Sequence, residues 1–150
     1  MKISTKVECG ILAIADIAIN ARNGKTVTVI SISGRQGISE KYLEQMLSSL
    51  RHSHLIKGQK GSGGGYILSK RAEDITLNEV INALESSLLN NDVPEIGNEN
   101  NGFSDVINEL LWNKIERYMS DCAMSVTVAD LAERYEKELE NNASEPMYYI

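Results

Sequence analysis

The side chains that most often carry chemistry are few in this 150-residue sequence and stand far apart. Its two cysteines, Cys9 and Cys122, exclude a disulfide framework and any CxxC zinc or redox motif. Its two histidines, His52 and His54, stand at the expected end of a helix with no cysteine or carboxylate beside them, so surface groups are favoured over a metal site. No Ser-His-Asp, Cys-His or metal–carboxylate arrangement is visible. The sequence therefore predicts a protein that is not an enzyme and binds no metal.

Both cysteines stay as candidate redox residues, each with a second interpretation. Cys9 falls within a predicted amphipathic helix, where a small core residue is the simpler interpretation and a redox-sensing thiol the sharper one. Cys122 follows the predicted long helix, and exposure there would leave its thiol open to reaction. No cationic residue adjoins it in the sequence to stabilise a thiolate.

The cationic side chains are concentrated in one half of the chain. Residues 1–71 hold eleven Lys and Arg against four Asp and Glu, a net charge of +7. Residues 72–150 hold four against seventeen, a net charge of −13, so the overall −6 hides a basic segment attached to an acidic remainder. On charge alone, a nucleic-acid-binding surface and a merely solvated basic face are equally compatible with this pattern.

The most informative polar groups of the basic half lie on one predicted helix, residues 39–53. Ser39 is a suitable N-cap, and Ile38 and Leu43 have the spacing of a hydrophobic staple. An apolar stripe along the helix predicts that its opposite face is open to solvent. That face carries hydrogen-bonding groups that suit bases and phosphates: Ser39, Lys41, Tyr42, Glu44, Gln45 and Ser48.

A glycine-rich segment follows this helix. Five of the eleven glycines fall within residues 58–65, between two short apolar runs, which predicts a β-hairpin with a flexible cationic tip. Glycine lets the backbone approach phosphates closely, because no Cβ holds it away. The P-loop order GxxxxGK(S/T) is absent. Four tip residues are expected to contribute contacts: Lys60, Ser62, Gly63 and Gly64.

The segments before that helix lead to two further expectations. Lys2 and Lys6 precede an apolar run that imitates a signal peptide, but Glu8 and Asp16 interrupt it. Because its apolar residues recur at helical spacing, we expect the first helix of a cytoplasmic protein. Residues 26–33 alternate β-branched side chains and favour a strand on propensity alone.

The acidic half is predicted to be helical. Thr76 caps a short helix that ends near Leu84, and a broad apolar stripe begins at Phe103. Because that stripe is too wide for the small domain to cover, we expect it to meet a second copy of the chain. A last helix runs from Thr127 to about Leu139. The predicted domains are a winged helix-turn-helix (1–86), a flexible loop (87–102), a helical dimerisation region (103–139) and a flexible C-terminal tail (140–150).

A helix, a short connection, a second helix and a glycine-tipped hairpin form the outline of a winged helix-turn-helix. The predicted fold class is therefore mainly α with a small β-hairpin (α+β), extended by a long dimerisation helix. In such modules the second helix of the motif enters the major groove, where base edges are distinguishable. We expect double-stranded DNA as the partner, with a protein-binding winged helix as the alternative.

Seven short motifs in this sequence form a set: 1–6 (MKISTK), 42–45 (YLEQ), 50–51 (LR), 55–57 (LIK), 60–68 (KGSGGGYIL), 111–112 (LW) and 127–131 (TVADL). Together they resemble the winged-helix regulators of the Rrf-two family, which includes IscR, NsrR and CymR. The resemblance covers nearly the whole chain to about residue 139. It implies a dimeric repressor, and it shortens the predicted strand to 26–29, with the following residues turning into a helix.

Carried over to this sequence, the resemblance implies that Glu44 and Gln45 read base edges, Glu44 by accepting a hydrogen bond from a cytosine amino group. It also implies roles for four more residues: Ser39 and Tyr42 in placing the helix, Lys6 at a phosphate and Lys60 in the minor groove.

Three positions depart from the family pattern. Residues 7–9 read Val-Glu-Cys where Gly-Arg-Tyr is common, which removes a cation near DNA and adds a carboxylate. Lys60 stands where many members have Arg, so its insertion into a narrow minor groove is expected to be weaker. His54 occupies a helix end that normally favours glycine.

The resemblance also bears on iron–sulfur chemistry. Cluster-binding relatives supply three closely spaced cysteines, or fewer with an acidic ligand from the first helix, near the loop before the long helix. Residues 87–121 contain no cysteine, so we expect no iron–sulfur cluster and no other cofactor. A cluster shared by Glu8, Cys9 and the Cys122 of a dimer mate is the alternative.

Family members without cluster cysteines include CymR-like regulators of cysteine metabolism, which act together with cysteine synthase (O-acetylserine sulfhydrylase). The tail of this chain resembles the CymR ending. Its aromatic side chains and terminal isoleucine suit a pocket that captures a substrate carboxylate. The expected partner-binding residues are Met147, Tyr148, Tyr149 and Ile150. A tail folded back onto its own dimer is one alternative, and control by a thiol or a small ligand is another.

Overall fold

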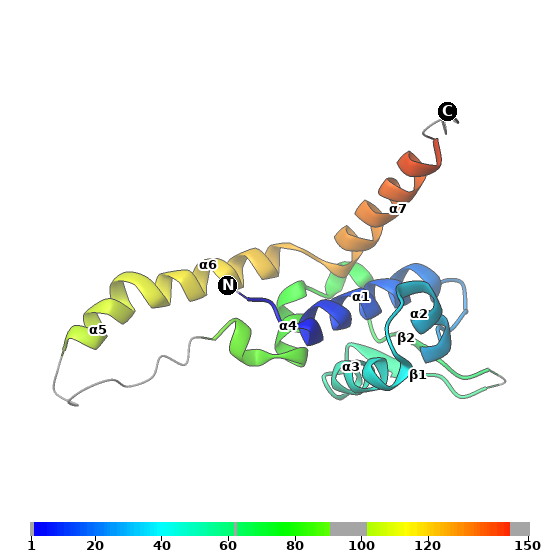
Figure 1. Ribbon diagram of the computed structural model, residues 1–150, viewed down its shortest axis with the longest axis horizontal. Helices are drawn as coiled ribbons and strands as arrows, with labels where there is room; N and C mark the ends of the chain where they lie inside the picture. Colours follow the sequence, from blue (N-terminus) through cyan, green and yellow to red (C-terminus); the bar gives the residue numbers. More distant parts are fainter. Residues whose placement is uncertain (1, 62, 91–101, 145–150) are drawn as a thin grey trace.

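The computed structural model describes residues 2–61, 63–90 and 102–144. A helical body carries a two-stranded antiparallel hairpin, and two helices, α6 and α7, extend from it in different directions (Figure 1). This confirms the predicted fold class. The elements are α1 (Thr5–Asn20), α2 (Val29–Gln36), α3 (Glu40–His52), β1 (Ile56–Gly58), β2 (Tyr66–Leu68), η1 (Ala72–Asp74), α4 (Leu77–Leu84), η2 (Ser86–Leu88), α5 (Phe103–Ile107), η3 (a π-helical turn, Asn108–Trp112), α6 (Asn113–Ser125) and α7 (Val128–Ser144).

Helix α1 lies at the centre of the body and packs against α3, α4 and α7. The predicted apolar stripe of α3 is fully buried, and Thr76 caps α4 in a capping box with Glu79, as its sequence position predicts. Helices α1 and α3 supply most of the largest fully buried side chains: Ile14, Ile17, Leu43, Met46, Leu47 and Leu50.

The prediction of a strand over residues 26–33, which rests on β-propensity, is wrong beyond the first residues of that segment. Val27 alone pairs with Tyr66, through backbone hydrogen bonds of 3.0 and 2.7 Å. From Val29 the chain is the helix α2, because Thr28 and Ser31 form a capping box and Ile32 is buried in the core. The shortened strand implied by the family resemblance is thus closer to the structure.

Two helices end or begin differently from their predictions. Helices α5, η3 and α6 form one continuous arm from Phe103 to Ser125, so Cys122 lies within the long helix and not beyond its end as predicted. Figure 1 shows the arm reaching away from the body. Helix α7 continues to Ser144, five residues beyond the predicted Leu139, so residues 140–144 of the predicted flexible tail are helical. The 3-10 helix η2 extends to Leu88, inside the predicted loop 87–102, and residues 91–101 of that loop lie outside the described residues. No described helix is both long and apolar enough to cross a bilayer.

Candidate nucleic-acid interface

The polar face of α3 is open to solvent because the opposite, apolar face of the helix packs in the core. The helix begins where the Ser39 hydroxyl accepts a hydrogen bond from the backbone N–H of Tyr42 (3.2 Å). The predicted contact residues are exposed (Ser39, Lys41, Glu44 and Gln45) or half-buried (Tyr42 and Ser48). One helical turn therefore presents an ammonium, a carboxylate and an amide together, which suits the donor and acceptor pattern of a major groove.

The hairpin that forms the wing is fastened to the body at its base. Strands β1 and β2 pair antiparallel with Lys57 opposite Ile67, and the backbone N–H of Gln59 donates to the carbonyl oxygen of Gly65 (2.8 Å). Gly65 has φ +132°, and a Cβ there would lie 2.9 Å from the carbonyl oxygen of Val27. Glycine is therefore required at this close approach.

The predicted tip residues do not all behave alike. Lys60 and Gly63 are exposed. The backbone N–H of Gly64, in contrast, donates to the carbonyl oxygen of Gly61 (3.2 Å), and its own carbonyl accepts from Thr26 Oγ1 (2.8 Å). The backbone N–H of Gly64 is therefore used within the wing, and a contact of Gly64 with DNA stays a prediction. Ser62 lies outside the described residues.

The N-terminal end of α1 carries the predicted phosphate contact Lys6, which is half-buried in the first helical turn. Ser4 caps this helix by accepting from the backbone N–H of Val7 (3.3 Å). The Ser4 hydroxyl also donates to Glu85 (2.5 Å), which ties the start of α1 to the end of α4. The position of Lys6 is thus fixed by the packing of α1 on α4.

Both histidines lie at the exposed C-terminal end of α3. His54 adopts φ +57°, the left-handed conformation that glycine favours, as the sequence position suggests. His52 Nδ1 lies 2.7 Å from the carbonyl oxygen of Ser48, and thus engages its own helix. The described part of the chain contains no group of three or more His, Cys, Asp or Glu suited to a metal ion.

The two cysteines differ in their surroundings. Cys9 is half-buried against the core, and burial, reinforced by the nearby Glu8 carboxylate, raises the pKa of its thiol. This favours the core interpretation over a reactive thiolate. Cys122 is exposed on α6 and lines an apolar hollow of about 390 Å³ with Ile81 and Met119 among its neighbours.

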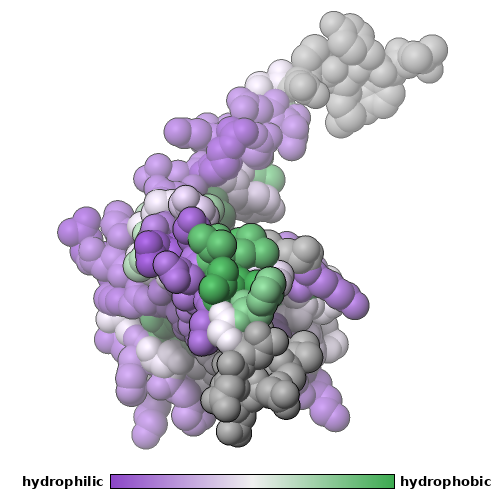
Figure 2. Space-filling view, turned by 90° about the vertical axis from the view of Figure 1, so that its left-hand side faces the viewer, coloured by the Kyte–Doolittle hydropathy of each residue, from purple (hydrophilic) through white to green (hydrophobic). Residues whose placement is uncertain are grey.

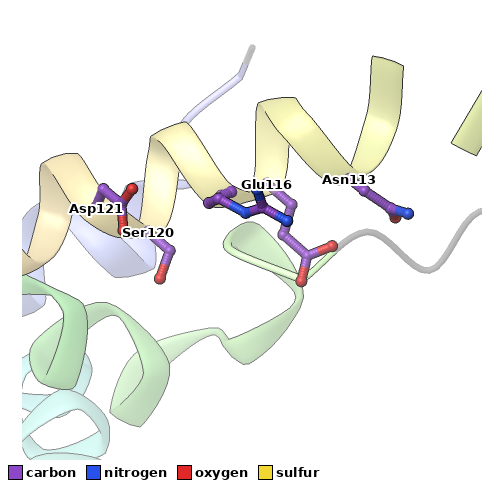
Figure 3. A pocket seen from close by; sticks show the side chains of 5 residues that line it. Asn113, Glu116, Ser120 and Asp121 are labelled. Atoms are coloured by element: carbon purple, nitrogen blue, oxygen red, sulfur yellow. The ribbon is translucent and has the colours of Figure 1, made fainter. Parts of the chain in front are cut away.

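Helix α6 also carries a row of polar side chains next to the apolar residues that meet α4. A hollow of about 370 Å³ is lined by Asn113, Glu116, Arg117, Ser120 and Asp121. Figure 3 shows Glu116 and Ser120 pointing from α6 toward the body, and Ser120 Oγ donates to Asn78 Oδ1 (3.4 Å). These groups follow one another along a single helix, so they are a solvated polar face and not a catalytic constellation.

The arm presents an apolar surface to solvent. Figure 2 shows hydrophobic side chains gathered where the arm faces the viewer. Leu110 is 62% exposed and Val106 50% exposed, and Ile107, Leu111 and Tyr118 are also open. The described residues of the chain therefore leave much of the broad predicted stripe exposed, which is typical of a helix that meets a partner.

A second apolar surface lies between α1 and α7. It is a groove of about 480 Å³, and it also includes Asp16, Arg35 and Gln36. Sequence reasoning treated Asp16 only as a charge that interrupts an apolar run. In the sequence, Asp16 stands among the apolar residues of the first helix, such as Ala13 and Ile17. A carboxylate in such a place is expected to have a charged or hydrogen-bonding partner. The apolar walls consist of Ile11, Leu12, Ile19, Leu131, Tyr135 and Leu139.

The sequence and the fold both match known transcriptional regulators. A family model described as "Rrf2: Iron-dependent Transcriptional regulator" matches residues 3–134. The HTH-type transcriptional regulator IscR of Erwinia tasmaniensis is 34% identical over 138 residues, which cover 91% of this chain and 81% of that protein.

Two solved structures are similar over nearly their full length. CymR, the global cysteine regulator of B. subtilis, gives a TM-score of 0.73 at 30% identity and covers 89% of this chain and 98% of its own. IscR of T. potens gives a TM-score of 0.71 at 29% identity and covers 99% of this chain and 95% of its own.

Proposed function

Because the chain belongs to the Rrf2 family of transcriptional regulators, we propose that it is a dimeric repressor that reads an operator through α3 and the wing. Family membership makes it a DNA-binding regulator and not an enzyme. The observation that carries the proposal is the exposed polar face of α3, with Lys41, Glu44 and Gln45, in the half of the chain whose net charge is +7.

The residues divide into base-reading and backbone-contacting groups. Glu44 and Gln45 read base edges, since a carboxylate accepts from cytosine and an amide pairs with adenine. Lys6 and Lys41 contact phosphates, and Lys60 reaches from the wing into the neighbouring minor groove. Selection of bound fragments from genomic DNA, followed by footprinting, tests this division. Recovery of no enriched motif at moderate salt would favour a protein-binding winged helix instead.

The dimer is supported by the apolar surfaces that the described chain leaves open. The arm points away from its own body, so its apolar side chains are suited to a second copy. Asn108 Oδ1 is buried and has no hydrogen-bond partner among the described residues, and a second copy would be able to supply a donor. The two-fold symmetry of such a dimer predicts two half-sites about one helical turn apart or a multiple of it.

We propose further that the chain holds no iron–sulfur cluster, although its family is described as iron-dependent. Support comes from the two cysteines. Cys9 has a raised thiol pKa and packs against the core, and Cys122 lies on the exposed α6. Neither residue is suited to contribute to a set of adjacent thiolates. Anaerobic purification followed by iron and sulfide assays tests this, and a brown protein with stoichiometric iron and sulfide would refute it.

The regulated process that we propose is cysteine metabolism, with cysteine synthase as the controlling partner. Support comes from the likeness to CymR, whose structure is described as that of the global cysteine regulator of B. subtilis. The residues proposed to bind, Met147 to Ile150, lie outside the described part of the chain. Helix α7 carries the chain away from the body to Ser144 (Figure 1), which favours a tail open to a partner.

Calorimetry tests this partner directly. The intact protein is expected to bind cysteine synthase, with O-acetylserine competing, and deletion of Ile150 is expected to abolish binding without lowering the melting temperature. A lowered melting temperature would indicate a tail that folds onto its own dimer. Absence of binding by the intact protein would favour the second candidate, a regulator controlled by a thiol or small ligand. The observation behind that candidate is the apolar hollow beside the exposed Cys122.

A further inference from the structure

A single buried carboxylate connects α1 to the end of α2. Asp16 is 2% exposed. Arg35 donates to it from Nη2 to Oδ1 (2.7 Å) and from Nε to Oδ2 (2.9 Å), and Gln36 Nε2 donates to Oδ2 (2.9 Å). Asn20 Nδ2 adds a weaker hydrogen bond to Oδ1 (3.3 Å). The charge of this carboxylate is thus balanced by a guanidinium in bidentate geometry, the strongest pairing available to a buried acid.

Apart from the hydrogen bonds to Asp16, few interactions hold helix α2 against α1. Ile32 is its one fully buried side chain, whereas Ile30 is 69% exposed. The eight-residue helix therefore lacks the apolar stripe that fixes α3 in the core. Its C-terminal end is held to α1 by the Asp16 hydrogen bonds.

That end of α2 leads directly into the recognition helix. Gly37 closes α2 in the left-handed conformation (φ +67°), and its N–H donates to the carbonyl oxygen of Ser33 (2.9 Å). Two residues later Ser39 caps α3. The first two turns of α3, which carry Lys41, Glu44 and Gln45, therefore follow a short turn whose starting point is fixed by Asp16.

We propose that Asp16 is a positioning residue for DNA binding: its carboxylate holds Arg35 and Gln36 so that the N-terminal turn of α3 enters the major groove in register. This inference rests on the proposed operator binding. Asp16 touches no DNA in this scheme, because it is buried inside the body. Its effect is mechanical, since loss of the carboxylate frees the end of α2 and lets the turn before α3 move.

Asp16→Asn is the main test, because asparagine keeps the shape and removes the charge. Operator affinity is measured by fluorescence anisotropy at several salt concentrations, and amide hydrogen exchange is measured for every helix. We expect affinity to fall by about tenfold, the scale of a lost charge-assisted hydrogen-bond pair. Exchange should rise in residues 29–39 but not in α4 or α7. The salt dependence of binding should keep its slope, since no phosphate contact is removed.

The matched control is Glu136→Gln. Glu136 accepts two hydrogen bonds from Arg22 (2.8 and 3.3 Å), and this bidentate pair joins the segment just after α1 to α7 and does not involve α2. The operator affinity of the Glu136→Gln protein should stay within about twofold of that of the original protein. A second variant, Gln36→Ala, removes one donor to Asp16 and should give a smaller loss of affinity and a smaller rise in exchange over the same residues. If the Asp16→Asn protein does not fold, the Gln36→Ala protein tests whether the Asp16 hydrogen bonds position α3.

Two results would overturn the proposal. One is unchanged operator affinity in a folded Asp16 or Gln36 variant. The other is a loss of affinity accompanied by faster exchange in all helices, which would mean that Asp16 only stabilises the whole fold. Failure of the original protein to bind any operator is a separate result, because it removes the proposed function itself before the variants are compared.

Discussion

The recognition helix α3 and the arm carry the same kind of amphipathic pattern and use it in opposite ways. In α3 the apolar residues Leu43, Met46 and Leu47 are at most 1% exposed, and the polar face is open to solvent, where we propose that DNA binds. In the arm the apolar residues Val106 and Leu110 are at least half exposed, and a row of polar side chains also turns toward the body. Helical periodicity therefore identifies an apolar face, but it does not say whether the same chain or a second copy covers it.

The largest effect should come from the exposed face of the arm. Leu110→Glu places a charge where we propose that two copies meet, and each change occurs twice in a two-fold dimer. We expect sedimentation velocity to show monomers and operator affinity to fall by about 100-fold or more. Glu109→Gln, on the same turn, is the control and should remain dimeric. A Leu110→Glu protein that stays dimeric would show that the arm is not the interface.

The polar face of α3 should respond in a different way. Glu44→Ala removes a proposed base contact, so discrimination among base pairs at one operator position should fall by about 1–3 kcal/mol while binding to unrelated DNA is retained. Competition with single-substituted operators measures this. Gln45→Ala should relax a different position. Uniform weakening on all sequences would contradict base reading by Glu44.

The wing should show a smaller effect that is independent of sequence. Lys60→Ala removes one cation from the tip, so binding to every DNA should weaken and the slope of log affinity against log salt should decrease by about one unit. Lys137→Ala, on the exposed surface of α7, serves as the control with an equal change in charge. An unchanged slope for Lys60→Ala would place the wing away from the duplex.

The smallest effect concerns α4, the helix that lies between the body and the arm. Burial alone would raise the pKa of Glu79, but hydrogen bonds from Lys70 (2.7 Å) and Thr76 (3.0 Å) together lower it below the usual range. A lowered pKa in the folded state stabilises the protein above the ordinary carboxyl pKa. This stabilisation is lost as pH falls through the lowered value.

Glu79→Gln should therefore cost about 0.5–1 kcal/mol at pH 7, a modest value because Glu79 and Lys70 are both partly exposed. The difference in unfolding free energy from the original protein should shrink as pH falls through the lowered pKa of Glu79. Urea unfolding at a series of pH values measures it. A difference that does not change with pH would show that the charge of Glu79 does not contribute.

Prediction from the sequence succeeded where the residues that determine an element lie within that element. The Ser39 cap, the Thr76 capping box and the glycine-rich hairpin involve residues within a few positions of each other, and their structures agree with the predictions. It failed for residues 29–33, where β-branched side chains favour a strand. There the capping box of Thr28 and Ser31, with the burial of Ile32, decides for helix.

By itself, therefore, the sequence determined the helices with clear caps and stripes, the wing, the separation of charge between the two halves and the open face of α3. The tertiary structure alone decided which apolar faces are covered, that Gly64 is bonded within the wing, and that Asp16 holds Arg35 and Gln36. The physical reason is range. Caps and periodicity depend on neighbours within about four positions, whereas burial and ion pairing depend on residues that only the fold brings together.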